Sequence, residues 1–158
     1  PQSVDIVFIV EALCHSNKKD VVMEQVKRAL RPNGYFIIFD GYTKGLNKLN
    51  ETETIVRKIS AIGVALEKFE VYKNFIELAK KYYFVVYEKD LSRQILPTAK
   101  RIEKIAKSVF DNPILSKLLI KILPTKLTYN AIFGYLFKTA LEDGIAIYMV
   151  TVLQKQKE

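Results

Sequence analysis

The sequence predicts an α/β fold in which short buried strands alternate with amphipathic helices. Residues 4–10 (VDIVFIV) and 35–39 (YFIIF) are continuous apolar runs of strand length, typical of parallel strands that are covered on both faces. A helical pattern and a turn separate the two runs, so together they form a βαβ unit with parallel strands. We therefore expect residues 1–158 to belong to a single domain built around a mostly parallel sheet.

The helix of this unit is expected to begin after Asn17, a candidate N-cap. Val22 and Val26 fall on one face of the helix, and the turn at residues 31–34 (RPNG) ends it, because proline cannot continue the hydrogen-bond ladder. A polar loop follows at residues 42–50.

Two further helices and a strand are expected next. The first helix starts near Asn50 and carries an apolar stripe with helical spacing at Ile55, Ile59, Ile62 and Leu66. The second covers residues 70–82, and residues 83–87 form a third strand.

The pattern is then helical up to Asp143. Asn112-Pro113 and Pro124 divide it into helices at about 93–110, 113–123 and 126–142, and Gly144 is well placed to end the last of them. Residues 145–153 form a fourth strand. We expect residues 91–143 to be a helical insertion, or lid, within the domain.

Charge and cysteine content exclude several classes. The 158 residues carry a net charge of +8, and the predicted pI is about 9.4. Nine basic and two acidic side chains fall in residues 91–141, so the excess belongs mainly to the helical insertion. One cysteine and one histidine exclude a disulfide framework and a zinc cluster, and we predict no metal site. No apolar run approaches the roughly 20 residues of a membrane-spanning helix, and we expect a cytoplasmic protein.

Two segments resemble the second half of the Rossmann-like (class I) S-adenosylmethionine-dependent methyltransferases. Residues 5–15 (DIVFIVEALCH) are similar to the family's D-x-V strand with a polar residue at its end, followed by a helix. Residues 30–34 (LRPNG) match its L-[KR]-P-G-G turn, with Asn33 replacing the first glycine, before a strand that closes in Asp40. The resemblance weakens across the insertion, and residues 145–153 match the family's final antiparallel strand. It implies three parallel strands plus a final antiparallel strand.

The resemblance also implies S-adenosylmethionine as cofactor, although the family's glycine-rich cofactor turn is missing. No two of the six glycines stand in a G-x-G arrangement. We therefore expect a fragment that begins near the family's fourth strand and is inactive alone, with most cofactor contacts made elsewhere. Because sheet edges are seldom left bare, we also expect the missing half or another chain to pair with residues 4–10. An oligomer is compatible with this expectation.

The carboxyl ends of the parallel strands are where the resemblance and general fold rules place the ligands. Val10, Glu11, Ala12 and Leu13 are expected to contact the cofactor. His15 and Glu11 are the candidate catalytic residues, with His15 as base or orienting donor. The alternative is that Glu11 fixes the loop and His15 packs beside the next helix.

Other polar and aromatic residues have two interpretations each. Asp40 either faces the methyl acceptor or caps a loop, and we expect Cys14 to be a small buried side chain, because methyl transfer needs no thiol nucleophile. Three tyrosines are further candidates for contact with the methyl acceptor, namely Tyr42, Tyr129 and Tyr135. The alternative is that they are core residues.

The segment at residues 113–123 is apolar, with Lys117 and Lys121 on one face. We favour a core helix whose lysines form its solvated edge. The alternative is a basic amphipathic helix that lies on an anionic membrane or admits a hydrophobic substrate.

Three functions are compatible with these features. The favoured one is methyl transfer to a small-molecule acceptor, anionic or lipid-like in character. A nucleic-acid methyltransferase or binder is suggested by the basic charge, but the strand closes in Asp40 where base-flipping enzymes have N-P-P-[YF] or D-P-P-[YF]. The third is a non-catalytic interaction domain.

Overall fold

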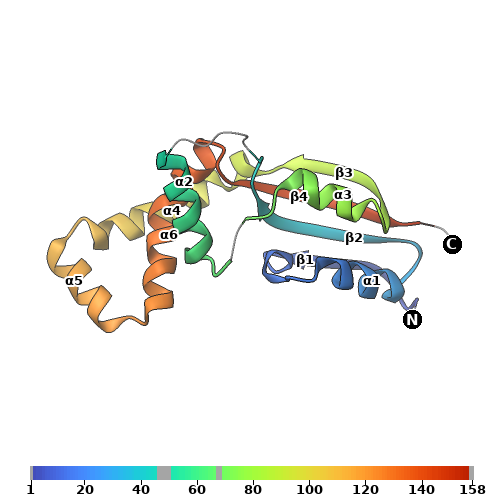
Figure 1. Ribbon diagram of the computed structural model, residues 1–158, viewed down its shortest axis with the longest axis horizontal. Coiled ribbons are helices and arrows are strands. Elements are labelled where there is room, and N and C mark those ends of the chain that lie inside the picture. Colours follow the sequence, from blue (N-terminus) through green and yellow to red (C-terminus); the bar gives the residue numbers. More distant parts are fainter. Residues whose placement is uncertain (1, 46–50, 67–68, 157–158) are drawn as a thin grey trace. The chain divides into compact units, whose positions relative to one another are not determined.

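The computed structural model describes residues 2–45, 51–66 and 69–156, which form two compact units. The sheet unit holds described residues 2–45, 70–91 and 147–156, and the helical unit holds 51–66, 69 and 92–146. The predicted helix start at Asn50 and most of the predicted loop at 42–50 lie outside the described residues. Along the chain (Figure 1) the elements are β1 (Val4–Val10), the 3-10 helix η1 (Leu13–His15), α1 (Lys19–Ala29), β2 (Leu30–Tyr42), α2 (Glu51–Gly63), α3 (Tyr72–Ala79), β3 (Tyr83–Asp90), α4 (Ser92–Phe110), α5 (Pro113–Ile122), α6 (Thr125–Glu142) and β4 (Ile147–Lys155).

The four strands form one sheet in the order β1-β2-β4-β3. β1 pairs with β2 in parallel, and β4 lies between β2 and β3, antiparallel to both. Three strands therefore run one way and the final strand runs the other. This confirms the predicted sheet, including the direction of its last strand.

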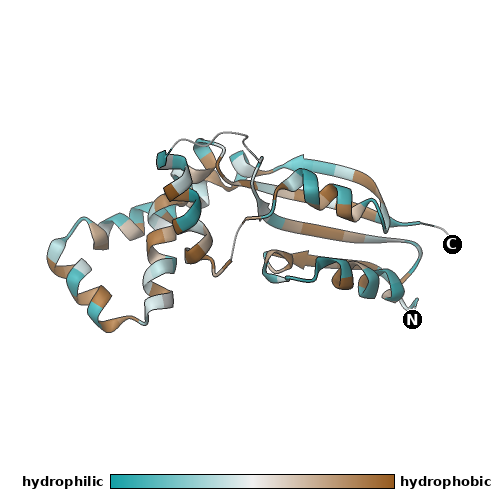
Figure 2. Cartoon of the chain, viewed as in Figure 1, coloured by the Kyte–Doolittle hydropathy of each residue, from teal (hydrophilic) through white to brown (hydrophobic). Residues whose placement is uncertain are grey.

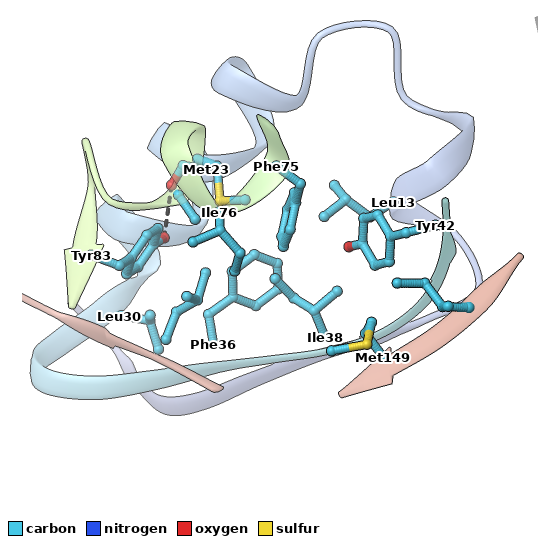
Figure 3. Close-up of a cluster of buried hydrophobic side chains, with 13 residues drawn as sticks. Leu13, Met23, Leu30, Phe36, Ile38, Tyr42, Phe75, Ile76, Tyr83 and Met149 are labelled. Atoms are coloured by element: carbon cyan, nitrogen blue, oxygen red, sulfur yellow. Dashed lines mark hydrogen bonds between the residues drawn. The ribbon is translucent and has the colours of Figure 1, made fainter. Parts of the chain in front are cut away.

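One face of the sheet packs against α1 and α3 and holds the main core (Figure 3). Phe36 and Ile38 of β2 are fully buried there, against Met23 of α1 and Phe75 of α3. The Tyr83 hydroxyl donates a 2.8 Å hydrogen bond to the Met23 carbonyl, which joins the start of β3 to α1. Burial raises the pKa of the Tyr83 phenol, so the hydroxyl remains a donor.

The opposite face of the sheet is exposed along β1, in contrast to the predicted burial on both faces. Phe8 is 72% exposed and Ile6 is 56% exposed. Ile6 pairs with Tyr35, and Tyr35 and Phe84 both pair with Gln154, so these residues share one face. We call it the bare sheet face, formed by Ile6, Phe8, Val10, Tyr35 and Phe84. Within the described residues no strand pairs with the outer edge of β1.

Several element boundaries differ from the prediction. Asn17 is not the N-cap of α1, because the helix begins at Lys19 and no side chain caps it. β2 begins at Leu30, directly after α1. The predicted turn at residues 31–34 therefore lies inside β2, where the pairing with β1 is irregular and Asn33 has a φ of 63°. α3 begins later than predicted because Val71 instead forms a bridge with Thr43.

The helical unit is built mainly from α2, α4 and α6, with Ala99, Ala140 and Leu141 buried in its core. The predicted stripe of α2 does not face this core, because Ile55 and Ile62 are each 50% exposed. Gly63 faces α6 instead, so closely that an added Cβ would overlap Phe133. The small residue, rather than the isoleucines, marks the buried side of α2.

α5 also departs from the favoured prediction. Asn112 caps it through its side-chain oxygen, which accepts from the amides of Ile114 and Leu115 at 3.0 and 3.1 Å. Yet the helix contains no buried residue. It is therefore not a core helix.

Candidate active site

The carboxyl ends of β1 and β2 meet at one edge of the sheet, where β4 begins. Gly41 of β2 pairs with Tyr148 of β4, and the Glu11 amide continues the ladder by donating to the Phe39 carbonyl at 2.8 Å. Polar side chains from three strand ends are thus brought together where open α/β sheets bind their ligands.

Asp40 fixes the loop between β1 and α1. Its carboxylate is buried, and its two oxygens accept from the backbone amides of Cys14 and Gly41, each at 2.8 Å. These bonds hold η1 against the end of β2. These contacts are those expected of a loop-capping aspartate, and a role of Asp40 toward the acceptor stays a prediction.

Glu11 has an unusual backbone and a side-chain partner. Its φ is 49°, a left-handed conformation that is uncommon outside glycine and clusters at functional sites. The pKa of Tyr148 is raised, first by burial of its phenol and then by the charge of the Glu11 carboxylate. The carboxylate also accepts a hydrogen bond from the Tyr148 hydroxyl. The phenol therefore stays protonated and holds the carboxylate in place.

Tyr148 is the site residue that the sequence analysis missed. The signal was present, because a final strand inserted beside β2 in the antiparallel direction must begin at the edge where β2 ends. Residues 145–148 therefore had to start near Asp40.

His15 lies at the end of η1 with its side chain exposed. In the described part of the chain its imidazole has no hydrogen-bond partner. It is available to a ligand, and its catalytic role stays a prediction.

Cys14 is held as a neutral thiol. Burial, reinforced by the charge of Asp40 and a hydrogen bond to it, raises the pKa of the Cys14 thiol to about 12. A thiol with this pKa is a poor nucleophile near neutral pH. Cys14 is only partly buried, rather than the fully buried side chain that we expected.

This pKa predicts slow alkylation of the single cysteine. At pH 8 the thiolate fraction is about 10³-fold below that of an ordinary cysteine, so labelling by iodoacetamide should be slower by about that factor. Asp40→Asn removes the charge and should accelerate labelling, which mass spectrometry can follow. A labelling rate equal to that of free cysteine would contradict the assignment.

The remaining predicted strand-end residues divide by burial. Leu13 and Tyr42 lie in the core (Figure 3), whereas Val10, Glu11 and Ala12 are exposed. The Tyr42 ring packs on Tyr72 and Phe75, with ring centroids 5.1 and 5.0 Å away. Tyr42 thus packs as a core aromatic residue, and its acceptor role stays a prediction. Leu13 can reach a ligand with its backbone alone.

Tyr129 and Tyr135 belong to the helical unit. The Tyr135 hydroxyl donates to Asp111 at 3.2 Å, and the Lys107 ammonium lies 5.6 Å from the centre of its ring. Tyr129 is partly exposed on α6. The structure gives Tyr135 contacts inside its own unit, and the acceptor role of both residues stays a prediction.

An open hollow of about 440 Å³ lies beside the strand-end site, between α3, β3 and the start of β4. Ile147 and Met149 line it together with Tyr72, whereas the Tyr148 side chain between them points to the opposite face of the sheet. The Tyr72 hydroxyl donates to Glu88 at 2.7 Å and lies 2.9 Å from the Thr151 hydroxyl. A mostly apolar hollow with polar groups at its rim suits an amphiphilic molecule.

The described residues contain no group of three or more histidine, cysteine, aspartate or glutamate side chains arranged to hold a metal ion. Among the helices described, none is both long enough and apolar enough to cross a membrane.

Comparisons with known proteins point to one enzyme class. A methyltransferase domain model matches residues 1–38. A sterol methyltransferase-like 3 of Botryococcus braunii is 29% identical over 125 residues, which cover 75% of this chain and 32% of the relative. A 24-methylenesterol C-methyltransferase 2 of Arabidopsis thaliana is 33% identical over 93 residues, or 57% of this chain and 26% of the relative. The chain thus spans about a third or less of these relatives.

Solved structures share the fold at low identity. The cyclopropane synthase MmaA2 of Mycobacterium tuberculosis superposes with a TM-score of 0.72 at 11% identity, covering 98% of this chain and 56% of that one. A geranyl diphosphate methyltransferase superposes with a TM-score of 0.64 at 14% identity, covering 98% and 52%. Sequence and fold together confirm the resemblance of this chain to the class I S-adenosylmethionine-dependent methyltransferases.

Proposed function

We propose that this chain forms the acceptor side of an S-adenosylmethionine-dependent methyltransferase whose acceptor is a sterol-like lipid. The observation that carries the proposal is the polar cluster at the strand ends, where Tyr148 holds Glu11 and Asp40 fixes the loop. The two curated relatives, named for sterol methylation, support the lipid-like acceptor.

The residues present fit part of the cofactor. When bound, S-adenosylmethionine supplies an electrophilic methyl group on a positively charged sulfonium. Glu11 offers a negative charge at the strand ends. A Cβ built on Gly41 would meet no atom within 4 Å, so there is open space at the end of β2. The glycine-rich turn that cradles such cofactors is not in this sequence, so we place those contacts on another polypeptide segment.

Glu11 can serve the acceptor in two ways. Methyl transfer to an uncharged carbon acceptor leaves a positive charge on that acceptor, which a nearby carboxylate stabilises. Glu11, or His15 four residues later, can then accept the proton whose loss restores neutrality. Tyr148 acts through Glu11 and is a positioning residue.

The bare sheet face indicates that the sheet unit lacks the layer that would cover this side of the sheet. Parallel sheets are normally covered on both faces, and Phe8 and Ile6 expose large apolar side chains here. We assign this face to the polypeptide that carries the glycine-rich half of the fold. The isolated chain is then expected to bind S-adenosylmethionine weakly or not at all in calorimetry, and tight binding would contradict this part of the proposal.

Activity is tested on the whole gene product that contains this chain. Glu11→Gln should lower the rate of tritiated methyl transfer to a sterol acceptor by about 10²–10⁴-fold, because the charge is lost while the size is kept. Glu24→Gln, an exposed position on α1, is the matched control and should leave the rate unchanged. His15→Ala separates the two candidate bases. Unchanged transfer in Glu11→Gln would remove Glu11 from the mechanism.

A further inference from the structure

α5 presents an apolar ridge to solvent rather than to the rest of its unit. Ile114, Leu118 and Ile122 are 78%, 51% and 67% exposed. The less exposed positions are Ser116 and Leu119, and Leu123 directly after the helix. Ile120 is near Ser116 around the helix but is itself 57% exposed. At about 100° per residue the three less exposed positions fall on one side of the helix, and Ile114, Leu118 and Ile122 fall on the other. Figure 2 shows the mixture of apolar and polar residues along this helix.

Two lysines border the ridge. Lys117 and Lys121 are exposed and one turn apart, and both lie beside Ile114 on the outward side of the helix. A long side chain with a terminal ammonium can lay its methylene groups along an apolar ridge and keep its charge in the polar layer above it. An apolar stripe edged by lysines is the pattern of helices that lie in the plane of a membrane interface.

The charge around α5 is not neutralised by its own unit. Residues 91–141 contain nine basic and two acidic side chains. Glu103 is bound by Lys107 at 3.1 Å and by Lys138 at 3.7 Å, and Asp111 accepts from Tyr135. Both acidic groups are thus engaged inside the unit. The described part of the helical unit also holds Glu51, Glu53, Glu142 and Asp143, and its eleven basic and six acidic side chains leave a net charge of +5.

We infer that α5 docks on an anionic lipid bilayer, with the ridge of Ile114, Leu118 and Ile122 in the interface and Lys117 and Lys121 against acidic headgroups. Charge complementarity selects this occupant, because an apolar protein groove would leave the two lysines without a partner. The inference concerns a surface other than the strand-end site and does not depend on methyl transfer. It also corrects the expectation of a core helix.

Vesicle co-sedimentation of the purified chain tests the inference. The chain should sediment with vesicles of phosphatidylcholine that contain 30 mol% phosphatidylserine. With vesicles of pure phosphatidylcholine, the chain should remain in the supernatant. Lys117→Gln with Lys121→Gln should weaken the partition coefficient by about five-fold for each lysine removed. The charge-matched control is Lys58→Gln with Lys100→Gln, on exposed positions of α2 and α4, and should bind as the parent does.

A second pair of variants tests the apolar ridge. Ile114→Ser with Ile122→Ser should reduce binding at least ten-fold. Ile55→Ser with Ile62→Ser removes the same side chains from α2, where each is 50% exposed, and should change little. All these positions are exposed, and circular dichroism verifies that the variants fold.

Three results would overturn the inference. They are no binding to the acidic vesicles, equal losses in the α5 variants and their controls, or binding that is insensitive to the α5 changes because the bare sheet face adsorbs to lipid. A fourth result is that the chain does not bind vesicles but self-associates, and that both double variants of α5 abolish this self-association. The ridge would then be an interface with a second copy of the chain.

Discussion

Asp40→Ala is expected to lower the free energy of unfolding by about 3–5 kcal/mol. The carboxylate is buried and accepts from the amides of Cys14 and Gly41, and a hydrogen bond to a charged group contributes about 1.5–3 kcal/mol. Alanine leaves both amides without this partner and frees η1 from the end of β2. Denaturant unfolding followed by circular dichroism measures the loss.

Asp5→Ala is the matched control for Asp40. The Asp5 side chain is 73% exposed, and its ion pair with Arg31 at 2.6 Å lies in solvent. Removing an exposed pair typically costs less than about 1 kcal/mol. Equal losses for the two alanine variants would mean that Asp40 does not anchor the loop.

Phe8→Asp is expected to prevent the sheet unit from joining the polypeptide that we propose covers its bare face. A carboxylate placed in an apolar interface must be desolvated without a partner, and the aromatic contact area is lost as well. We expect the association constant to fall by at least 10³-fold. Titration of this chain with a polypeptide carrying the glycine-rich half of the fold measures it.

The isolated chain should fold with this substitution, because Phe8 is 72% exposed. Ile105→Asp, at a residue 60% exposed on α4 of the helical unit, introduces the same charge away from the sheet and should leave association intact. Association that survives Phe8→Asp would show that the bare face is not the interface.

The sheet was predictable because its signals are local and strong. The apolar runs at residues 4–10 and 35–39, separated by a helix and a turn, leave few arrangements besides two parallel strands. Chain order and the family resemblance then placed the last strand antiparallel. The same constraint on β4 could have located Tyr148, which the sequence analysis missed, but the pairing of Tyr148 with Glu11 depends on a side-chain contact between elements far apart in sequence.

Burial was less predictable than secondary structure. The composition of β1 indicates two covered faces, yet one face is bare, because burial depends on what packs against a strand and composition reports the strand alone. In α2 the isoleucine stripe suggested the buried side, whereas the close approach of α6 at Gly63 determines it. For α5 the apolar content suggested a core helix, but no described element covers its outer ridge.

The position of β4 in the sheet has a consequence for the order of folding. β4 comes last along this sequence but lies between β2 and β3 in the sheet. β2 and β3 therefore cannot become part of one sheet until residues 147–155 have been synthesised. The described segments of the helical unit all precede β4. During synthesis, which proceeds at about 5–20 residues per second, the helices can pack on the ribosome while the sheet waits for its central strand.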